Sequence, residues 1–481
     1  MKQTNKNILS SRYASQRMNT IFSQKTKVVL ERELWIKILE YQQKEALVRI
    51  EKSVLNKYKK AIDRVDFEEI EKLERITRHD VKARIQHFNL VAGIKPKDQK
   101  IHLGLTSRDI TDNVELIQLK RGLESIFSGY LHLLDIMQQT SLTYKKLQMA
   151  ARTHHVPAQL TTLGRRLAMY VEPLTEHLKG LKLFINRLPF RGVRGAVGTQ
   201  AEILRVFGSQ KAVDLLNKKL SEEFGFSRVL VATGQIYPRV VDFEIASHLF
   251  PLAAVCSSFA TTLRLWCGLG FVSEGFSKSQ TGSSAMPHKQ NSRSSERVVS
   301  LVKLIKSQLG ALADISCEQW EEGDVSCSAL RRAVLPDIFY ASDGVCQTMC
   351  DILKKMVVFE KEIKRERSSL IDFLGSANLL VFLTKKGLGR EQAHQIIKKY
   401  SQVVMTAKRE SLQTRRLLEL VAKDEDVASL GIDIKDLKRA TRDKKALLGL
   451  AEQQCQAVAN EAQKFIKKCK DQETYKVEEI L

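Results

Sequence analysis

Apolar residues recur at helical spacing through most of this chain. The longest run lies between Asn113 and Gln148, contains no proline and extends over more than thirty residues. A helix of this length is stable only when it packs against equally long neighbours, as in a helical bundle. The positions that set its apolar face are Leu116, Leu119, Leu123, Ile126 or Phe127, Tyr130, Leu134 and Met137.

Two further segments predict long helices, one from about residue 237 to 268 and one from residue 294 to beyond 312. Strand alternation is nearly absent, although residues 228–232 fit a short extended piece. The most apolar region, residues 250–272, is interrupted by Arg264 and by several Ser and Thr, so it indicates a buried helix and not a membrane span. The pattern therefore predicts an all-α protein.

Two breaks in the helical pattern divide the chain into three predicted domains. A Gly- and Pro-containing loop at 92–97 precedes the longest helix, so the N-terminal helical domain is expected to end near residue 112. The charged run 360–367 separates the central helices from a tail of shorter ones. We therefore predict domains 1–112, 113–361 and 362–481, of which the central one is a bundle of long helices.

Composition narrows the class of partner. An apolar content of 43% and a charged content of 28% are those of a soluble globular protein, and 78 Lys and Arg against 55 Asp and Glu give a net charge of +23. A nucleic-acid-binding protein gathers its basic residues on one face. Here they are scattered, with mild enrichment at 57–60 and 464–470. The charge therefore favours anionic small molecules, whose encounter a positive potential accelerates. A steep salt dependence of DNA or RNA binding would favour the alternative.

The eight cysteines form no CxxC pair and show no zinc-like spacing with histidine, so no metal site is expected. The N-terminus lacks the apolar core and cleavage site of a signal peptide. We therefore expect reduced thiols in a cytoplasmic protein that does not associate with membranes.

A Gly- and Ser-rich loop carries the strongest chemical signal. Residues 282–291 read Gly-Ser-Ser-Ala-Met-Pro-His-Lys-Gln-Asn, within a loop expected over 278–293. Ser283 and Lys289 lie six residues apart across the turn set by Pro287, so both can face one site. The alternative interpretation is a flexible surface linker.

Other segments supply candidate acid, base and anion-binding groups. Residues 152–162 place a histidine pair in a Pro-containing loop, which suits proton transfer near neutral pH, although two histidines alone are more often structural. The Arg-His-Asp run within 77–81 is either functional or a solvated helix face. Thr106 and Asp109 form a capping box that opens the longest helix, and a helix N-terminus favours bound anions.

Taken together, these segments resemble the adenylosuccinate lyases of the fumarase/aspartase superfamily. GSSAMPHKxN resembles the superfamily signature loop, and the segments that select this family are SRYAS at 11–15, RHDV at 78–81, THxxPAQxTT at 153–162 and TGQxYxR at 233–239. The motifs occur in family order over nearly the whole chain. The resemblance implies a three-domain all-α fold whose long central helices assemble into a homotetramer, with each site shared by three chains. It also implies β-elimination of fumarate from adenylosuccinate and from SAICAR, with no metal or organic cofactor.

The resemblance also assigns roles to individual residues. Ser283 is expected to be the base and His154 the acid, His79 assists the acid, and Lys289 with Asn291 holds the succinyl end. Thr106 and Ser107 are expected to bind a substrate carboxylate. Further substrate contacts are expected from Arg78, Asp80 and Gln235, and contacts to the nucleotide end from Arg12, Tyr13, Arg297, Ser328 and Arg332.

The chain departs from the family pattern at two positions. Val156 and Gly323 stand where many members carry Gln and Arg, which puts one polar contact and part of the nucleotide site in doubt. Two alternatives within the superfamily therefore stay open. One is a lyase for a different succinyl adduct or amino acid, and the other is a non-catalytic descendant.

Overall fold

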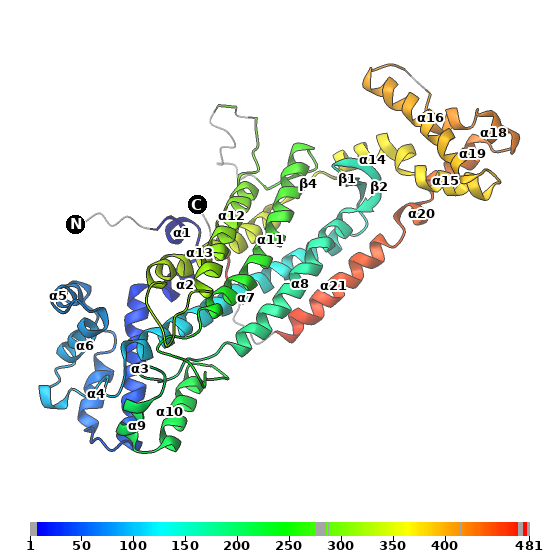
Figure 1. Cartoon of the computed structure of the whole chain (residues 1–481). Helices are drawn as coiled ribbons and strands as arrows, with labels where there is room; N and C mark the ends of the chain where they lie inside the picture. Colours follow the sequence, from blue (N-terminus) through cyan, green and yellow to red (C-terminus); the bar gives the residue numbers. More distant parts are fainter. Residues whose placement is uncertain (1–6, 276–284, 287, 414, 470–474, 479–481) are drawn as a thin grey trace.

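The computed structural model describes residues 7–275, 285–286, 288–413, 415–469 and 475–478, and it is an elongated helical molecule (Figure 1). A bundle of long helices runs along its length. One end of the bundle carries the N-terminal helices, and the other carries a hairpin and the C-terminal helices. The N-terminal elements are α1 (Ile8–Arg12), α2 (Gln16–Ile21), α3 (Gln24–Glu45), α4 (Lys52–Lys60), α5 (Phe67–Thr77), α6 (Asp80–Val91) and the 3-10 helix η1 (Pro96–Asp98).

The three long helices predicted from periodicity are present. The predicted run 113–148 corresponds to α7, which begins six residues earlier, at the capping box, and ends at Thr143. The other two predicted helices are α11 and α12. The elements of the bundle and of the connection beside it are α7 (Ser107–Thr143), α8 (Leu163–Arg187), α9 (Ala201–Phe207), α10 (Gln210–Glu223), α11 (Val240–Gly268), α12 (Arg293–Ser316) and α13 (Ser328–Lys355).

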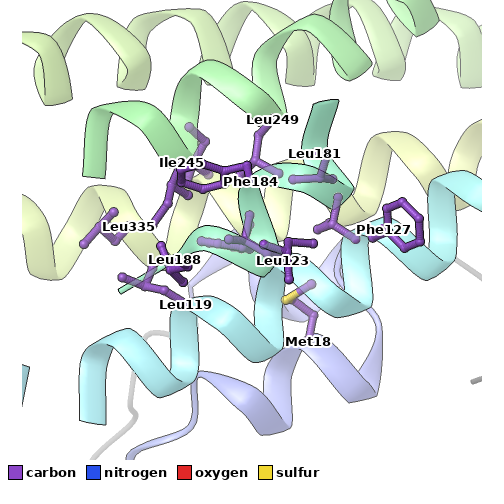
Figure 2. Close-up of a cluster of buried hydrophobic side chains, with 14 of the residues drawn as sticks. Met18, Leu119, Leu123, Phe127, Leu181, Phe184, Leu188, Ile245, Leu249 and Leu335 are labelled. Atoms are coloured by element: carbon purple, nitrogen blue, oxygen red, sulfur yellow. The ribbon is translucent and has the colours of Figure 1, made fainter. Parts of the chain in front are cut away.

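Helix α7 is the centre of the bundle because most of its side chains are buried on every side, and not only along one stripe. Figure 2 shows how its neighbours share one core. Burying one Leu, Ile, Phe or Met side chain contributes roughly 1.5–3 kcal/mol, so this shared core stabilises the packing of the helices. The labelled core residues are Met18 of α2, Leu119, Leu123 and Phe127 of α7, Leu181 and Phe184 of α8, Leu188 just after α8, Ile245 and Leu249 of α11, and Leu335 of α13.

A β-hairpin stands where the sequence predicted only a loop. Strand β1 (Gln148–Thr153) pairs antiparallel with β2 (Val156–Thr162), and the short strands β3 (Val272–Ser273) and β4 (Val357–Val358) form a second pair. In the predicted extended piece 228–232, Val229 makes an isolated parallel bridge to Phe190. The structure is therefore predominantly helical, and the segment that carries the predicted acid lies on a hairpin that the weak alternation of its sequence did not reveal.

The C-terminal helices form a satellite with its own core. Leu379, Leu383 and Leu437 are fully buried there, among helices that leave the axis of the bundle. The last helix returns and packs beside α7 and α8. The elements are α14 (Glu360–Leu374), α15 (Ser376–Lys385), α16 (Arg390–Arg409), α17 (Leu417–Val421), α18 (Glu425–Ser429), α19 (Ile434–Arg442), α20 (Lys444–Leu448) and α21 (Ala451–Lys468).

Helix α11 is the one helix among the described residues that is long and apolar enough to cross a membrane by length and composition. It packs against α8, α12 and α13, and its Leu252, Cys256 and Phe259 are fully buried in the bundle. A core helix of a globular protein passes the same test of length and composition. All eight cysteines are free thiols in this structure.

Candidate active site

A cleft of about 430 Å³ opens at the N-terminal end of α7, between α6 and the start of α13. It gathers segments that lie far apart in the sequence, because the N-termini of α6, α7 and α13 converge there. Seven of the residues predicted from sequence line this cleft: His79, Asp80, Thr106, Ser107, Gln235, Ser328 and Arg332. Two cations that the sequence analysis missed, Lys27 and Arg108, line it as well.

The capping box predicted at the start of α7 is confirmed. The Thr106 N–H donates to Asp109 Oδ2 at 2.8 Å, so the chain turns into the helix with Thr106 and Ser107 at its mouth. The positive end of the helix dipole and the remaining free N–H groups of the first turn favour an anion at this place. The local geometry is therefore suited to binding an anion.

His79 connects two of the predicted segments. It is the N-cap of α6, and its Nδ1 accepts the N–H of Lys82 at 3.3 Å. Its Nε2 lies 3.4 Å from Ser107 Oγ. Because Nδ1 is an acceptor, the neutral ring carries its proton on Nε2 and donates it toward Ser107. His79 thus presents a proton at the mouth of the α7 site.

Asp80 is held as a carboxylate. Burial by itself disfavours its charge, but Arg84 at 3.2 Å and the Val81 N–H at 2.8 Å outweigh burial and lower the pKa of Asp80 below its usual value. Arg84 also pairs with the fully buried Glu31 at 2.6 Å. Across the cleft, Arg332 approaches Asp80 at 3.7 Å, so the two walls carry complementary charges.

A buried ionic network lies beneath the cleft, and the sequence analysis missed it as a unit. Asp109 Oδ1 accepts from Arg191 Nη1 and from the Arg194 N–H, both at 2.7 Å. Two similar ion pairs join Asp112 to Arg239 at 3.2 Å and Asp242 to Arg331 at 2.6 Å. The sequence did contain a signal for this network, because acidic residues stand in helical turns that are otherwise buried. Buried charges require partners, so such residues indicate buried ion pairs. The network fixes the first turns of α7, α11 and α13 relative to one another.

Gly323 explains one departure from the family pattern. Its φ is +138°, a backbone conformation that L side chains rarely adopt, and a β-carbon there would come 2.9 Å from Ile236 Cγ1. Beside it, the Gln235 N–H donates to the Glu322 carbonyl at 2.7 Å. The segment therefore packs as a glycine turn against the Gln235 segment, and a side chain at this position would be strained and would require Ile236 to shift.

A second cluster contains the other residues that were predicted to contact the nucleotide end of the substrate. The Arg297 guanidinium lies 5.5 Å from the centre of the Tyr13 ring. Burial lowers the pKa of Arg297, and the positive charge of Arg12 adds to this effect. Tyr13 rests against Gly344, which lies twelve residues beyond Arg332 on α13 and therefore about 18 Å away along the helix. Within one chain, this cluster and the cleft are separate places.

His154 occupies the exposed tip of the β1–β2 hairpin. It and His155 are the two central residues of the turn, with φ values of 51° and 61°. Two consecutive positive φ values are the signature of a type I′ turn, which histidine tolerates better than most residues. The prediction of a loop was thus wrong in its local structure, because a two-residue turn presents the histidines.

The signature loop is described only in part. Ser283 and Pro287 lie outside the described residues. Lys289 is exposed, and its N–H donates to the Met286 carbonyl at 3.0 Å. Behind the loop, the buried Glu274 accepts the N–H groups of Ser294 and Ser295 at 3.0 and 2.8 Å, so it caps α12.

Two remaining predicted residues lie away from the cleft lining. Asn291 lies just before α12 and lines a separate pocket of about 170 Å³ beside Glu274. Arg78 ends α5 in a left-handed conformation with φ of 52° and is exposed, and it is not among the residues that line the cleft.

The predicted site residues therefore fall at distant places in one chain. Ser107 begins α7, whereas the hairpin follows the other end of this helix. With 37 residues, α7 separates its ends by about 55 Å. Lys289 lies before the start of α12. This helix has 24 residues and is about 36 Å long, and the chain continues toward the cleft from its other end. Among the residues that the structure describes, no group of three or more His, Cys, Asp or Glu is placed to hold a metal ion.

Known family models match most of this chain. A family model described as lyase matches residues 2–304, and one described as adenylosuccinate lyase C-terminus matches residues 372–458. Two curated relatives, both named adenylosuccinate lyase, are similar over most of their length. The protein of Schistosoma mansoni is 36% identical over 82% of each chain, and that of Saccharomyces cerevisiae is 33% identical over 87% of each.

Solved structures share the fold at lower sequence identity. The 3-carboxy-cis,cis-muconate lactonizing enzyme of Pseudomonas putida superposes with a TM-score of 0.79 at 21% identity, covering 96% of this chain and 100% of its own. A fumarate lyase of Mesorhizobium sp. BNC1 gives a TM-score of 0.77 at 17% identity, covering 93% and 98%. These likenesses confirm the predicted all-α, fumarase-like fold. The family model over residues 2–304 and the relatives above 30% identity place this chain in the adenylosuccinate lyase family.

Proposed function

We propose that this enzyme removes fumarate from adenylosuccinate to leave AMP, and from SAICAR to leave AICAR. The observation that carries the proposal is the cleft at the start of α7. There the Thr106–Ser107 helix terminus, His79, Gln235 and Arg332 line one cavity in a chain of this family. Both substrates are multiply charged anions, and a cleft with a helix N-terminus and several cations complements them.

The reaction requires a base, an acid and stabilisation of developing negative charge. In our proposal Ser283 takes the proton from the carbon beside a carboxylate, the C–N bond breaks, and His154 protonates the departing nitrogen. Thr106, Ser107 and Lys289 hold the carboxylates on which charge accumulates. Lys289 and backbone N–H groups favour the alkoxide form that a serine base needs.

We further propose that the working enzyme is a homotetramer in which different chains complete each site. Support comes from the length of α7, since the cleft and the hairpin that carries His154 lie at opposite ends of a helix about 55 Å long. Helix α11 adds a second argument. Only 44% of its most apolar stretch is buried within the chain, and Leu265 is 46% exposed. Apolar surface of this kind is typical of a subunit interface. We also propose that the enzyme is cytoplasmic, because free thiols suit a reducing compartment.

The direct test is turnover of adenylosuccinate by the purified protein, followed by loss of its ultraviolet absorbance and by appearance of fumarate. We expect turnover in the presence of EDTA and its loss in His154→Ala with the oligomer intact. No turnover by the folded parent would contradict the proposed function and would favour a different succinyl adduct or a non-catalytic descendant.

Shared sites make a quantitative prediction for mixtures. His154→Ala and His79→Ala are each expected to be inactive, but equal amounts unfolded and refolded together form hybrids. If the cleft and the hairpin come from different chains, each contributes an intact partner half of the time, so about one quarter of the sites recover. Activity that stays at the level of the separate variants would exclude sharing between these two residues.

A further inference from the structure

We propose that Arg152 and Glu366 form a positioning pair through which the C-terminal part of the chain fixes the turn that carries His154. The inference rests on the proposed role of His154 and adds two residues that the motifs do not assign. Neither residue is placed in contact with substrate. Their effect is on the geometry of the turn.

The turn needs an external constraint. His154 and His155 both have positive φ, and each non-glycine residue in such a conformation costs of order 1 kcal/mol or more. The side chain of His154 is exposed, so packing around it does not hold the turn within this chain. A strained conformation persists only when surrounding contacts determine it.

Arg152 supplies a contact at the required place. Its Nη1 donates to the His155 carbonyl at 2.9 Å, across the turn. Its Nη2 forms an ion pair with Glu366 of α14. The two side chains are only 13% and 19% exposed, so the pair is screened less than a surface salt bridge. The planar guanidinium thus bonds the turn with one nitrogen and α14 with the other. A lysine cannot reproduce this geometry.

The rest of α14 holds the pair in register with the hairpin. Arg367, the next residue, donates from Nη1 to Gln148 Oε1 at 3.0 Å at the base of β1. Leu374 packs with Ala150 and Leu160 in a small core between the hairpin and this helix. The strands also contain an irregularity, since β2 has one residue more than β1 between the pairs Ala150–Leu160 and Arg152–Pro157. Such a bulge re-aims the strand end, so α14 and the bulge together direct the tip.

Glu366→Ala on the intact enzyme is the decisive variant, with Glu362→Ala as its matched control. Glu362 lies on the same helix and pairs with Arg365, but that pair is 41% and 80% exposed. Misplacing a catalytic group by about 1 Å can cost about 100-fold in rate. We expect Glu366→Ala to lower kcat by about tenfold to 100-fold with KM within about twofold, because the cleft that binds substrate is untouched. Glu362→Ala should match the parent.

Amide hydrogen exchange of peptides spanning 150–160 gives a readout that does not depend on activity. Faster exchange in Glu366→Ala, and not in Glu362→Ala, is expected if the pair holds the turn. Unchanged exchange together with unchanged kcat would overturn the proposal. An inactive parent would instead overturn the proposed function, and the exchange comparison would still decide whether the pair holds the turn.

A charge swap separates positioning from simple tethering. Arg152→Glu with Glu366→Arg restores an ion pair between hairpin and helix, but a carboxylate at 152 cannot donate to the His155 carbonyl. We therefore expect the swap to recover thermal stability while kcat stays low. Full recovery of kcat by the swap would show that tethering alone is sufficient and would overturn the role of the bond across the turn.

Discussion

Asp109→Asn tests whether the buried ionic network builds the anion site at the start of α7. Asp109 and Arg191 are both fully buried, and their ion pair spans 2.7 Å. Oδ1 of Asp109 also accepts the N–H of Gly195 at 3.1 Å, and Oδ2 accepts the N–H of Thr106 at 2.8 Å. An asparagine keeps the shape and one acceptor, but it removes the charge and turns its amide donor toward the Thr106 N–H.

The expected loss follows from these contacts. Removing one partner of a buried ion pair costs about 3–5 kcal/mol, because the remaining charge is left uncompensated. Asp436→Asn is a matched control, since Asp436 holds the same capping-box position at the start of α19, where its partner Asp433 is exposed. There only a solvated cap is weakened, with an expected loss of about 1 kcal/mol or less.

Urea unfolding at one fixed protein concentration, followed by helical circular dichroism, measures both variants. The parent, Asp109→Asn and Asp436→Asn must be compared at that same concentration because the proposed association would contribute to apparent stability. We also expect Asp109→Asn to raise KM, since Thr106 and Ser107 lose their support. If the two variants lost the same stability, Asp109 would be acting as an ordinary cap and the charge argument would be refuted.

Two further predictions concern backbone and pH. Burial lowers the pKa of His102 to about 4, and Trp35 Nε1 donates to its Nδ1 at 3.1 Å, so the folded state holds it neutral. Between about pH 6.5 and 4 the unfolded state then binds more protons, and the parent loses up to about 3 kcal/mol as the pH falls. Asparagine tolerates the φ of 67° at this position, so His102→Asn should fold normally. We expect this variant to lose less unfolding free energy than the parent between about pH 6.5 and 4, and an equal loss would contradict the argument. Gly323→Ala should lower the free energy of unfolding by about 1–3 kcal/mol and raise KM, because the φ of +138° and the contact with Ile236 disfavour a β-carbon. Unfolding and KM equal to those of the parent would show that the turn adapts.

Helix α7 shows why much of the fold is predictable from sequence. Its apolar spacing and the Thr106–Asp109 capping box are local signals, and the structure confirms both. The segment motifs likewise predicted residues that now share one cleft, although the catalytic roles themselves stay predictions. Local pattern sufficed here because a helix obtains its backbone hydrogen bonds from neighbours in sequence.

The hairpin and the ionic network show what local pattern could not reveal. Strand β1 contains no β-branched residue before Thr153, and β2 carries Pro157, so neither has a strong strand signal. Contacts with α14, more than 200 residues away in sequence, stabilise the pair. Asp109 and Arg191 are separated by 82 positions. Non-local contacts of this kind leave no periodic trace, so the sequence identified the histidines but not the turn that presents them.

The length of the bundle helices and the placement of the acid are connected by the same physics. Long helices are stable only when packed together, and packing them along one axis places the cleft and the His154 tip at opposite ends of α7. The proposed elimination requires these groups at one reacting bond, so under this proposal association is a condition of the chemistry. A tip that acts on another chain cannot be ordered by its own cleft. Contacts on the other side of the turn must hold it instead. In this chain Arg152 bonds across the turn and forms an ion pair with Glu366 of α14.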